Sequence, residues 1–212
     1  MIESKSFKLY LNSLNHKKIE TIAALTNILA DDLSEASGKR VVVNIQSVRD
    51  GSGLINAGLM NVALMKDEPC FVCVDDLAVD NLEYQPNAAL LSLDMMADGE
   101  ENQPDEYYLC SHLLRSNCPV TGQPDWGTVY IKYRGRQINS ESFLRYIISF
   151  RQCQDFHEHC VERIFLDLLD KCGCEALSVY ARYTRRGGLD INPYRATANY
   201  SSEAQLIRTS RQ

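Results

Sequence analysis

A cysteine and an aspartate lie seven residues apart in the stretch SNCPVTGQPDWGTVY, residues 116–130. Cys118 is followed by proline and glycine and then by Asp125, and an extended run, TVYIKY at 128–133, comes next. Proline fixes φ and glycine allows close backbone approach, so the pattern predicts a loop of fixed shape between two extended segments. Such a loop can hold a thiol nucleophile beside a proton donor. The structural alternative is a small buried cysteine beside an aspartate in a turn.

A second group of reactive side chains, DFHEHC at 155–160, is predicted to open a helix. Asp155 with Glu158 three residues later forms a capping-box pattern, which would explain both carboxylates without a function. His157 and His159 point about 200° apart on a helix, so they do not share a metal ion. Glu158, held ionised near the helix N-terminus, could instead accept paired hydrogen bonds from the N–H/NH₂ edge of a guanine-like ring.

Two further segments suit an anionic ligand. The stretch ESKS at 3–6 opens the first predicted helix, where hydroxyls, a lysine and helix N–H groups favour phosphate. The stretch RRGG at 185–188 is predicted to form a turn whose glycines let a ligand approach the backbone. The structural alternatives are a serine cap with a solvated lysine at the first segment, and a hairpin turn with exposed charge at the second.

Length and composition bound the class of protein. The chain has 212 residues, enough for one large domain or two small ones. Its net charge of −6 argues against a general nucleic-acid surface, and no run approaches the ~18 apolar residues of a membrane span. The N-terminus lacks a signal-peptide pattern, so we expect a cytoplasmic protein whose eight cysteines are reduced. Cys70 and Cys73 form a CxxC pair, but no second pair follows at zinc-finger spacing.

Hydrophobic periodicity predicts a mixture of helices and strands. Helices are expected over 4–15, 18–37, 141–150 and 155–171, and strands over 40–47, 70–74, 90–94, 107–114, 128–133 and 176–183, with a short return strand at 189–191. The acidic stretch 97–106 carries Gly and Pro and is the best linker candidate. The polar tail after Tyr194 is expected to be irregular.

The sequence repeats weakly at an offset of 136 residues. At this offset, identical residues match in two predicted helices and then in a predicted strand. The matches are Ser4 with Ser140, Phe7 with Phe143, Tyr10 with Tyr146, Ile28 with Ile164, Asp31 with Asp167, Leu33 with Leu169 and Val43 with Val179. We interpret this as two copies of one module, with helices packed on an antiparallel sheet. The second copy lacks the lysine of the 3–5 segment, and the first has Thr21 and Ile22 where the second has His157 and Glu158. That complementarity is expected if one site is assembled from both copies.

The chain carries four blocks, which occur in the order ESKSFKLYLNS, CPVTGQPDWG, FHEHC and YARYTRRGGLDINPY. In these blocks the chain resembles the two-module 7-cyano-7-deazaguanine reductases of queuosine biosynthesis. These are NADPH-dependent nitrile reductases of the tunnelling-fold (T-fold) superfamily. The resemblance implies an α+β fold of tandem T-fold modules, antiparallel sheets with paired helices on one face. The first module with its linker would span 1–104, and the second, carrying the nucleophile, 105–212. Only Met1 precedes the IESK motif, so we expect the first module to lack its leading hairpin, by truncation or by natural reduction.

The resemblance also implies a role for each site residue. Cys118 would attack the nitrile carbon to give a covalent thioimide, and Asp125 would donate a proton to the nitrogen. The deazaguanine would be bound by Ile2, Glu3, Ser4, His157 and Glu158, and NADPH by Ser4, Lys5, Arg186 and Gly187. Two NADPH molecules would supply the hydrides. No metal is implied, no nucleic acid or membrane is contacted directly, and a homodimer is expected.

Two other functions stay open from the sequence. One is a metal-dependent T-fold hydrolase of the cyclohydrolase kind, which would need a metal ion or a different acid–base set. The other is a non-catalytic protein that binds a purine or pterin, in which Cys118 would be dispensable for binding.

Overall fold

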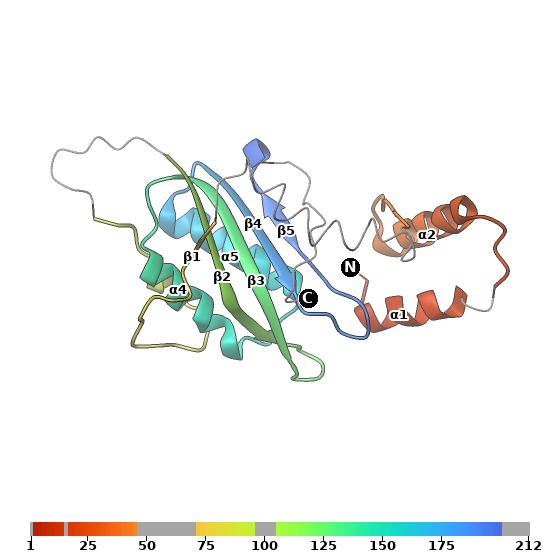
Figure 1. Cartoon of the computed structure of the whole chain (residues 1–212), viewed down its shortest axis with the longest axis horizontal. Helices are drawn as coiled ribbons and strands as arrows, with labels where there is room; N and C mark the ends of the chain where they lie inside the picture. The colour runs from red at the N-terminus through yellow and green to blue at the C-terminus, as the bar shows by residue number, and fades with distance from the viewer. Residues whose placement is uncertain (1, 15–16, 46–70, 96–104, 201–212) are drawn as a thin grey trace. The chain divides into compact units, whose positions relative to one another are not determined.

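The structure, a computed structural model, describes residues 2–14, 17–45, 71–95 and 105–200 (Figure 1). Its elements in chain order are α1 (Ser4–Ser13), α2 (Ile22–Ser37), β1 (Val72–Cys73), η2 (Ala88–Leu90), β2 (Asp105–Asn117), β3 (Pro124–Gly135), α4 (Ser140–Ser149), η3 (Phe150–Gln152), α5 (His157–Cys172), β4 (Ala176–Tyr183), β5 (Tyr194–Ala196) and η4 (Ala198–Tyr200). The mixture confirms the predicted α+β class. No helix in the described part of the chain combines the length and apolar character needed to cross a bilayer.

The chain forms two compact units, each described by itself. The first unit comprises Met1–Val62 with Arg186–Leu189, and the second comprises Ala63–Arg185 with Asp190–Gln212. The second unit contains a five-stranded sheet in the order β1-β2-β3-β4-β5. β1 pairs with β2 in parallel, and the other neighbours are antiparallel. The long β2–β3 hairpin therefore forms the centre of the sheet, and its connecting loop carries Cys118.

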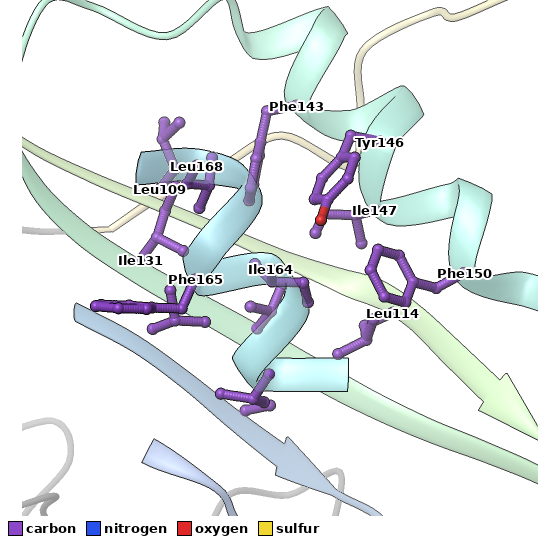
Figure 2. Close-up of a cluster of buried hydrophobic side chains, with 14 of the residues drawn as sticks. Leu109, Leu114, Ile131, Phe143, Tyr146, Ile147, Phe150, Ile164, Phe165 and Leu168 are labelled. Carbon is purple, nitrogen blue, oxygen red and sulfur yellow. The ribbon is translucent and has the colours of Figure 1, made fainter. Parts of the chain in front are cut away.

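Two helices, α4 and α5, cover one face of this sheet (Figure 1). α4 begins after Asn139, whose side-chain oxygen accepts a hydrogen bond from the Ser142 amide at 2.9 Å. α5 ends at Gly173, which adopts the left-handed conformation with φ 62° that glycine tolerates best. The apolar faces of both helices meet the sheet, as Figure 2 shows.

The core of the second unit consists of buried aromatic and branched side chains from α4 with η3, from α5 and from the sheet. Phe143, Tyr146, Ile147 and Phe150 come from the α4 segment, Ile164, Phe165 and Leu168 from α5, and Leu109, Leu114 and Ile131 from the strands (Figure 2). Burying side chains of this size stabilises a fold by about 1.5–3 kcal/mol each before conformational entropy is counted. The core therefore fixes the sheet against α5, which carries His157 and Glu158 at its N-terminal end.

The first unit contains the helix pair α1 and α2. Glu3 caps α1 by accepting hydrogen bonds from the Lys5 and Ser6 amides at 2.8 Å each. Thr21 caps α2, which ends at Gly38 with φ 70°. The Tyr10 hydroxyl joins the two helices by donating to Asp32 Oδ2 at 2.6 Å.

The two helix pairs repeat one another in length and in their connecting hydrogen bond. α1 and α4 have 10 residues each, and α2 and α5 have 16 each. Tyr146 donates to Asp167 Oδ2 at 2.7 Å, as Tyr10 does to Asp32. The internal repeat is therefore present at the level of the helix pair.

The structure corrects the register of that repeat. α4 follows α1 by 136 residues, but α5 follows α2 by 135, so the predicted gapless match fails after the first helix. Asp32, not Asp31, corresponds to Asp167. His157 and Glu158 consequently correspond to Ile22 and Ala23, and the first copy still lacks both functional side chains.

Several predicted strands differ from those in the structure. Residues 40–45 form no strand, since no described segment pairs with them, and residues 46–47 lie outside the described residues. The predicted strand 90–94 is the end of η2 and a single bridge from Leu93 to Ile138. The return strand lies at Tyr194–Ala196, because the turn extends further than expected. The proposed linker lies outside the described residues except at 105–106, which begin β2.

Candidate active site

Cys118 lies in the tight loop that joins β2 to β3. Its backbone N–H donates to the Gln123 carbonyl at 2.9 Å, and its carbonyl accepts from the Gly122 N–H at 2.9 Å. Gly122 has φ 68°, a conformation that favours glycine. The predicted loop of fixed shape is therefore confirmed, and it holds the Cys118 backbone from both sides.

The base of this loop is tied to the segment that leads into α5. The Asn117 amide donates to the Cys153 carbonyl at 2.7 Å, and the Asn117 side chain donates to the Arg151 carbonyl at 3.2 Å. Arg115 in turn donates to the Asn117 side-chain oxygen at 3.1 Å. These bonds connect the cysteine loop to the chain that enters α5.

Asp125 and His157 form a buried pair next to the loop. Asp125 is not on the loop, as the sequence suggested, but on β3, where it pairs in register with Ser116. The Asp125 carboxyl is 3% exposed, and its Oδ2 lies 3.3 Å from Nε2 of His157. Both groups are buried at ion-pair distance, and this burial keeps water away from the carboxyl, as a proton donor in an enzyme site requires.

Tyr183 holds the imidazole of His157 in place. The two rings are stacked, with centroids 3.9 Å apart and planes 16° apart. Tyr183 comes from β4, where it pairs with Gly127 of β3. Burial raises the pKa of the Tyr183 hydroxyl well above its usual value, so the ring stays neutral. Our sequence reasoning assigned no role to Tyr183 or Gly127, although both lie inside the family motifs; only the antiparallel pairing of β3 and β4 brings them together.

The thiols near this site differ in their surroundings. Cys118 is half-buried, whereas Cys153 and Cys160 are buried. A hydrogen bond to Cys153, together with burial, raises the pKa of Cys160 far above the usual range for a thiol. Cys118 is therefore the thiol of these three that a substrate can reach.

The start of α5 differs from the predicted capping box. The helix begins at His157 after Phe156, and Asp155 accepts hydrogen bonds from the Phe156 amide and from the His159 ring at 2.8 Å each. Glu158 therefore lies in the first turn without a reciprocal cap, half-buried. Its carboxylate is stabilised there by the helix N-terminus, which leaves the functional interpretation of Glu158 in place.

The first unit contains the predicted residues of the IESK motif. Ser4 and Lys5 lie in the first turn of α1, and Ile2 precedes the cap residue. Both carboxylate oxygens of Glu3 bind helix N–H groups, which lowers the pKa of Glu3 chiefly through the Lys5 amide. The predicted phosphate site at free helix N–H groups is thus wrong for the Lys5 and Ser6 amides, because Glu3 occupies them. The Ser4 hydroxyl and the Lys5 ammonium are the groups that still suit an anion.

The arginine–glycine segment forms a two-residue turn. Arg186 N–H donates to the Leu189 carbonyl at 2.8 Å, and the Leu189 N–H donates back at 3.1 Å. Gly187 and Gly188 have φ 58° and 90°, the positive φ values that a two-residue hairpin turn requires at its two central positions. A guanidinium next to two residues without side chains can approach an anionic group such as a phosphate.

The structure thus brings some predicted site residues together within one unit. Cys118, Asp125, His157 and Glu158 belong to the second unit, on the β2–β3 hairpin and the adjoining first turn of α5. The other predicted residues, Ile2, Glu3, Ser4, Lys5, Arg186 and Gly187, belong to the first unit.

Comparisons with known families match both units. The family described as QueF-like protein matches residues 124–202, and the family described as "Nitrile reductase, 7-cyano-7-deazaguanine-reductase N-term" matches residues 1–45. A crystal structure of the archaeosine synthase QueF-Like in the apo form resembles 46% of this chain and 96% of its own, at 16% identity. Its TM-score of 0.40 is too low to support an argument about the fold.

Whole-chain relatives carry one shared name, NADPH-dependent 7-cyano-7-deazaguanine reductase. The protein of Saccharophagus degradans is 48% identical over 195 residues, covering 92% of this chain and 66% of that protein. The protein of Burkholderia cenocepacia is 49% identical over 212 residues, covering 100% of this chain and 72% of that protein. That of Colwellia psychrerythraea is 44% identical and covers 100% and 70%. Although it spans only 66–72% of the length of these relatives, this chain belongs to the NADPH-dependent 7-cyano-7-deazaguanine reductase family.

Proposed function

We propose that this chain reduces the nitrile of 7-cyano-7-deazaguanine to an aminomethyl group with two NADPH, in the biosynthesis of queuosine. The observation that carries the proposal is the buried pair of Asp125, on the strand that follows the Cys118 loop, and His157, at the start of α5, 3.3 Å apart. A nitrile has no leaving group, so addition to its carbon requires a nucleophile together with a proton for the nitrogen. Cys118 and Asp125 supply these two functions.

The first step forms one bond and moves one proton. The Cys118 thiolate adds to the nitrile carbon, and the nitrogen takes a proton from Asp125, which gives a thioimide on Cys118. His157, next to Asp125, passes a proton back to the Asp125 carboxylate after each proton transfer to the substrate nitrogen. When bound, NADPH supplies the hydride. Two hydrides and two protons convert the nitrile into the amine, and the Cys118–carbon bond breaks when the first reduction releases the imine.

Substrate and cofactor are assigned to separate groups of residues. Glu158 accepts hydrogen bonds from the N–H/NH₂ edge of the deazaguanine, and Ile2, Glu3, Ser4 and His157 are further residues of substrate binding. The phosphates of NADPH are bound by Arg186 at the glycine turn, with Gly187, Ser4 and Lys5. The resemblance of the motifs supports these roles, together with the cationic and helix-terminal positions of the side chains.

The finer architecture is part of the same proposal. The helix pairs α1–α2 and α4–α5 are the helical parts of two T-fold modules, as their matched lengths and equivalent Tyr–Asp hydrogen bonds support. We also expect a cytoplasmic homodimer, from the family resemblance.

The experiment is a stoichiometric reduction. Limiting 7-cyano-7-deazaguanine is mixed with the protein and excess NADPH, and the loss of NADPH absorbance is followed together with the mass of the product. We expect two NADPH consumed for each amine formed, because a nitrile needs two hydrides to become an amine. A folded protein that consumes no NADPH would contradict the proposal. A protein that releases a hydrolysed product only with added metal would also contradict it and would favour the cyclohydrolase alternative.

A further inference from the structure

Outside the active site, two cysteines and a histidine converge on β1 and β2. The ligand atoms of Cys73, Cys110 and His112 all lie within 4.8 Å of one another. We propose that they form a binding site for a thiophilic divalent cation of the zinc type, separate from the nitrile-reducing site. The proposal does not depend on the reductase activity.

The parallel pairing of β1 with β2 creates this cluster. Cys73 is the register partner of Cys110, so the two side chains project side by side from the same face. His112 follows Cys110 by two positions and therefore points the same way. Val74 and Leu109, the neighbours of the two cysteines, are buried in the core under the helices. The cluster thus lies on the sheet face opposite α4 and α5, with Cys110 six positions and His112 four positions before Ser116 on β2.

The spacing suits a tetrahedral ion after small side-chain adjustments. With Zn–S about 2.3 Å and Zn–N about 2.0–2.1 Å, ligand atoms around zinc lie roughly 3.5–3.8 Å apart. Rotation about the side-chain bonds of two cysteines closes the remaining gap without moving the backbone. Three protein ligands leave the fourth position for water. A donor set of two thiolates and one imidazole favours zinc over hard cations such as magnesium or calcium.

Neighbouring residues fix the histidine and the strands. His112 Nδ1 lies 2.9 Å from Thr128 Oγ1, so Nε2 is the ring nitrogen left for an ion. Asp75, two residues after Cys73, accepts hydrogen bonds from the Ser111 hydroxyl at 2.6 Å and from the His112 amide at 2.9 Å. These bonds tie the segment just after β1 to Ser111 and His112 of β2. A bound ion would add a cross-link between β1, which has only two residues, and the centre of the sheet.

The test uses Zn²⁺ and Co²⁺ on the full chain in the Cys118→Ala background, which removes the reactive thiol as a competing ligand. Chelator-treated, reduced protein is titrated with Co²⁺, and the visible and thiolate charge-transfer bands are recorded before displacement by Zn²⁺. We expect one equivalent per chain, tetrahedral Co²⁺ bands, and a melting temperature that rises with Zn²⁺ because the ion binds only the folded state.

Variants locate the site. Cys73→Ser and His112→Asn should abolish the tetrahedral Co²⁺ bands or the thiolate charge-transfer band. The matched control Cys174→Ser, which removes a cysteine elsewhere, should leave these bands unchanged. Thr128→Val should weaken binding by about 10-fold, the usual effect of losing a residue that orients a ligand. Cys73 is exposed, so Cys73→Ser tests the site even if a variant at buried Cys110 fails to fold. Binding of less than one equivalent, or binding that survives Cys73→Ser, overturns the proposal.

Discussion

Gly127 and Tyr183 are register partners across β3 and β4, and they lie so close that a larger residue at 127 would have to displace its neighbours. A Cβ atom added at Gly127 would lie 3.0 Å from Tyr183 Cδ1 and 3.2 Å from the Arg182 carbonyl oxygen. The imidazole of His157 stacks on the Tyr183 ring, 3.9 Å away between centroids. The side chain of His157 then meets Asp125. The close approach of Gly127 to Tyr183 is therefore linked, through the stacked imidazole, to the proposed proton-donating pair.

Replacing Gly127 with alanine should reduce turnover more than it reduces stability. The added methyl group must displace a fully buried tyrosine, and overpacking of this kind costs about 1–3 kcal/mol of unfolding free energy. The displaced ring moves His157 away from Asp125, and we expect kcat to fall by about 100-fold or more, as when an acid–base group is misplaced. Steady-state NADPH oxidation and thermal unfolding measure the two effects.

The matched control is Gly173→Ala at the end of α5. Gly173 has φ 62° with no atom within 4 Å of an added Cβ, so alanine there is strained but clashes with nothing. It should lower stability by about 1 kcal/mol and leave kcat near that of the parent protein. Equal losses of kcat in the two variants would show that activity follows stability alone and not the position of Tyr183.

Asp125→Asn should slow the formation of the thioimide. The amide keeps the shape of the side chain but cannot donate an acidic proton, and loss of a general acid typically costs about 10²–10⁴-fold in rate. The rate of mass gain with substrate, in the absence of NADPH, measures this step directly. Asp155→Asn is the control, because Asp155 accepts hydrogen bonds from the Phe156 amide and the His159 ring, at the exposed start of α5. An unchanged rate in Asp125→Asn would remove Asp125 from the mechanism.

Arg186→Ala should weaken the binding of NADPH and not the chemistry. A charge-assisted hydrogen bond contributes about 1.5–3 kcal/mol, so KM for NADPH should rise by roughly 10- to 100-fold while the adduct with Cys118 still forms. Arg185→Ala, at the position just before the turn, is the control for charge alone. A KM for NADPH that rises equally in both variants would argue for general electrostatic attraction instead of a specific phosphate contact.

The protein should lose stability as the pH rises above 10. Burial, followed by a hydrogen bond to Asp32, raises the pKa of Tyr10 from 10.0 to about 12, and burial with Asp167 raises the pKa of Tyr146 further. The unfolded chain therefore releases these protons first. The stabilisation is complete below pH 10 and declines as the pH increases toward the folded-state values, by up to about 1.4 kcal/mol per pH unit for each proton.

Tyr146→Phe tests this assignment by urea denaturation between pH 7 and 11. At pH 7 we expect a loss of about 1–3 kcal/mol, because the buried hydroxyl no longer binds Asp167. Above pH 10 the stability of the variant should fall less steeply than that of the parent. Tyr10→Phe, at the more exposed equivalent pair, should have a smaller effect at pH 7. Identical slopes in Tyr146→Phe and the parent would show that Tyr146 does not titrate on unfolding.

The sequence predicted those features that depend on local chemistry. The four helices follow from apolar periodicity, α2 and α5 end at Gly38 and Gly173, and β4 lies where the sequence placed a strand. The loop of Cys118 follows from its proline and glycine residues. The one-residue offset between the copies was missed, because it arises in the connection between two helices and leaves no periodic signal.

The contacts that complete the site depend on pairing across the sheet and could not be read from spacing. Tyr183 and Gly127 are 56 residues apart and meet only through the register of β3 with β4. The role of Glu3 as the cap of α1 was also missed, because a glutamate can cap a helix only when its longer side chain folds back. The cluster of Cys73, Cys110 and His112 likewise needed the parallel pairing of β1.

The most direct test of the proposed mechanism is an intact-mass measurement of the protein mixed with 7-cyano-7-deazaguanine in the absence of NADPH. Addition of Cys118 to a nitrile expels no group, so we predict a mass gain equal to the whole substrate. The gain should disappear in Cys118→Ala and remain in Cys174→Ser. Folded protein that gains no mass, or a Cys118→Ala variant that gains the same mass, would contradict covalent catalysis by Cys118.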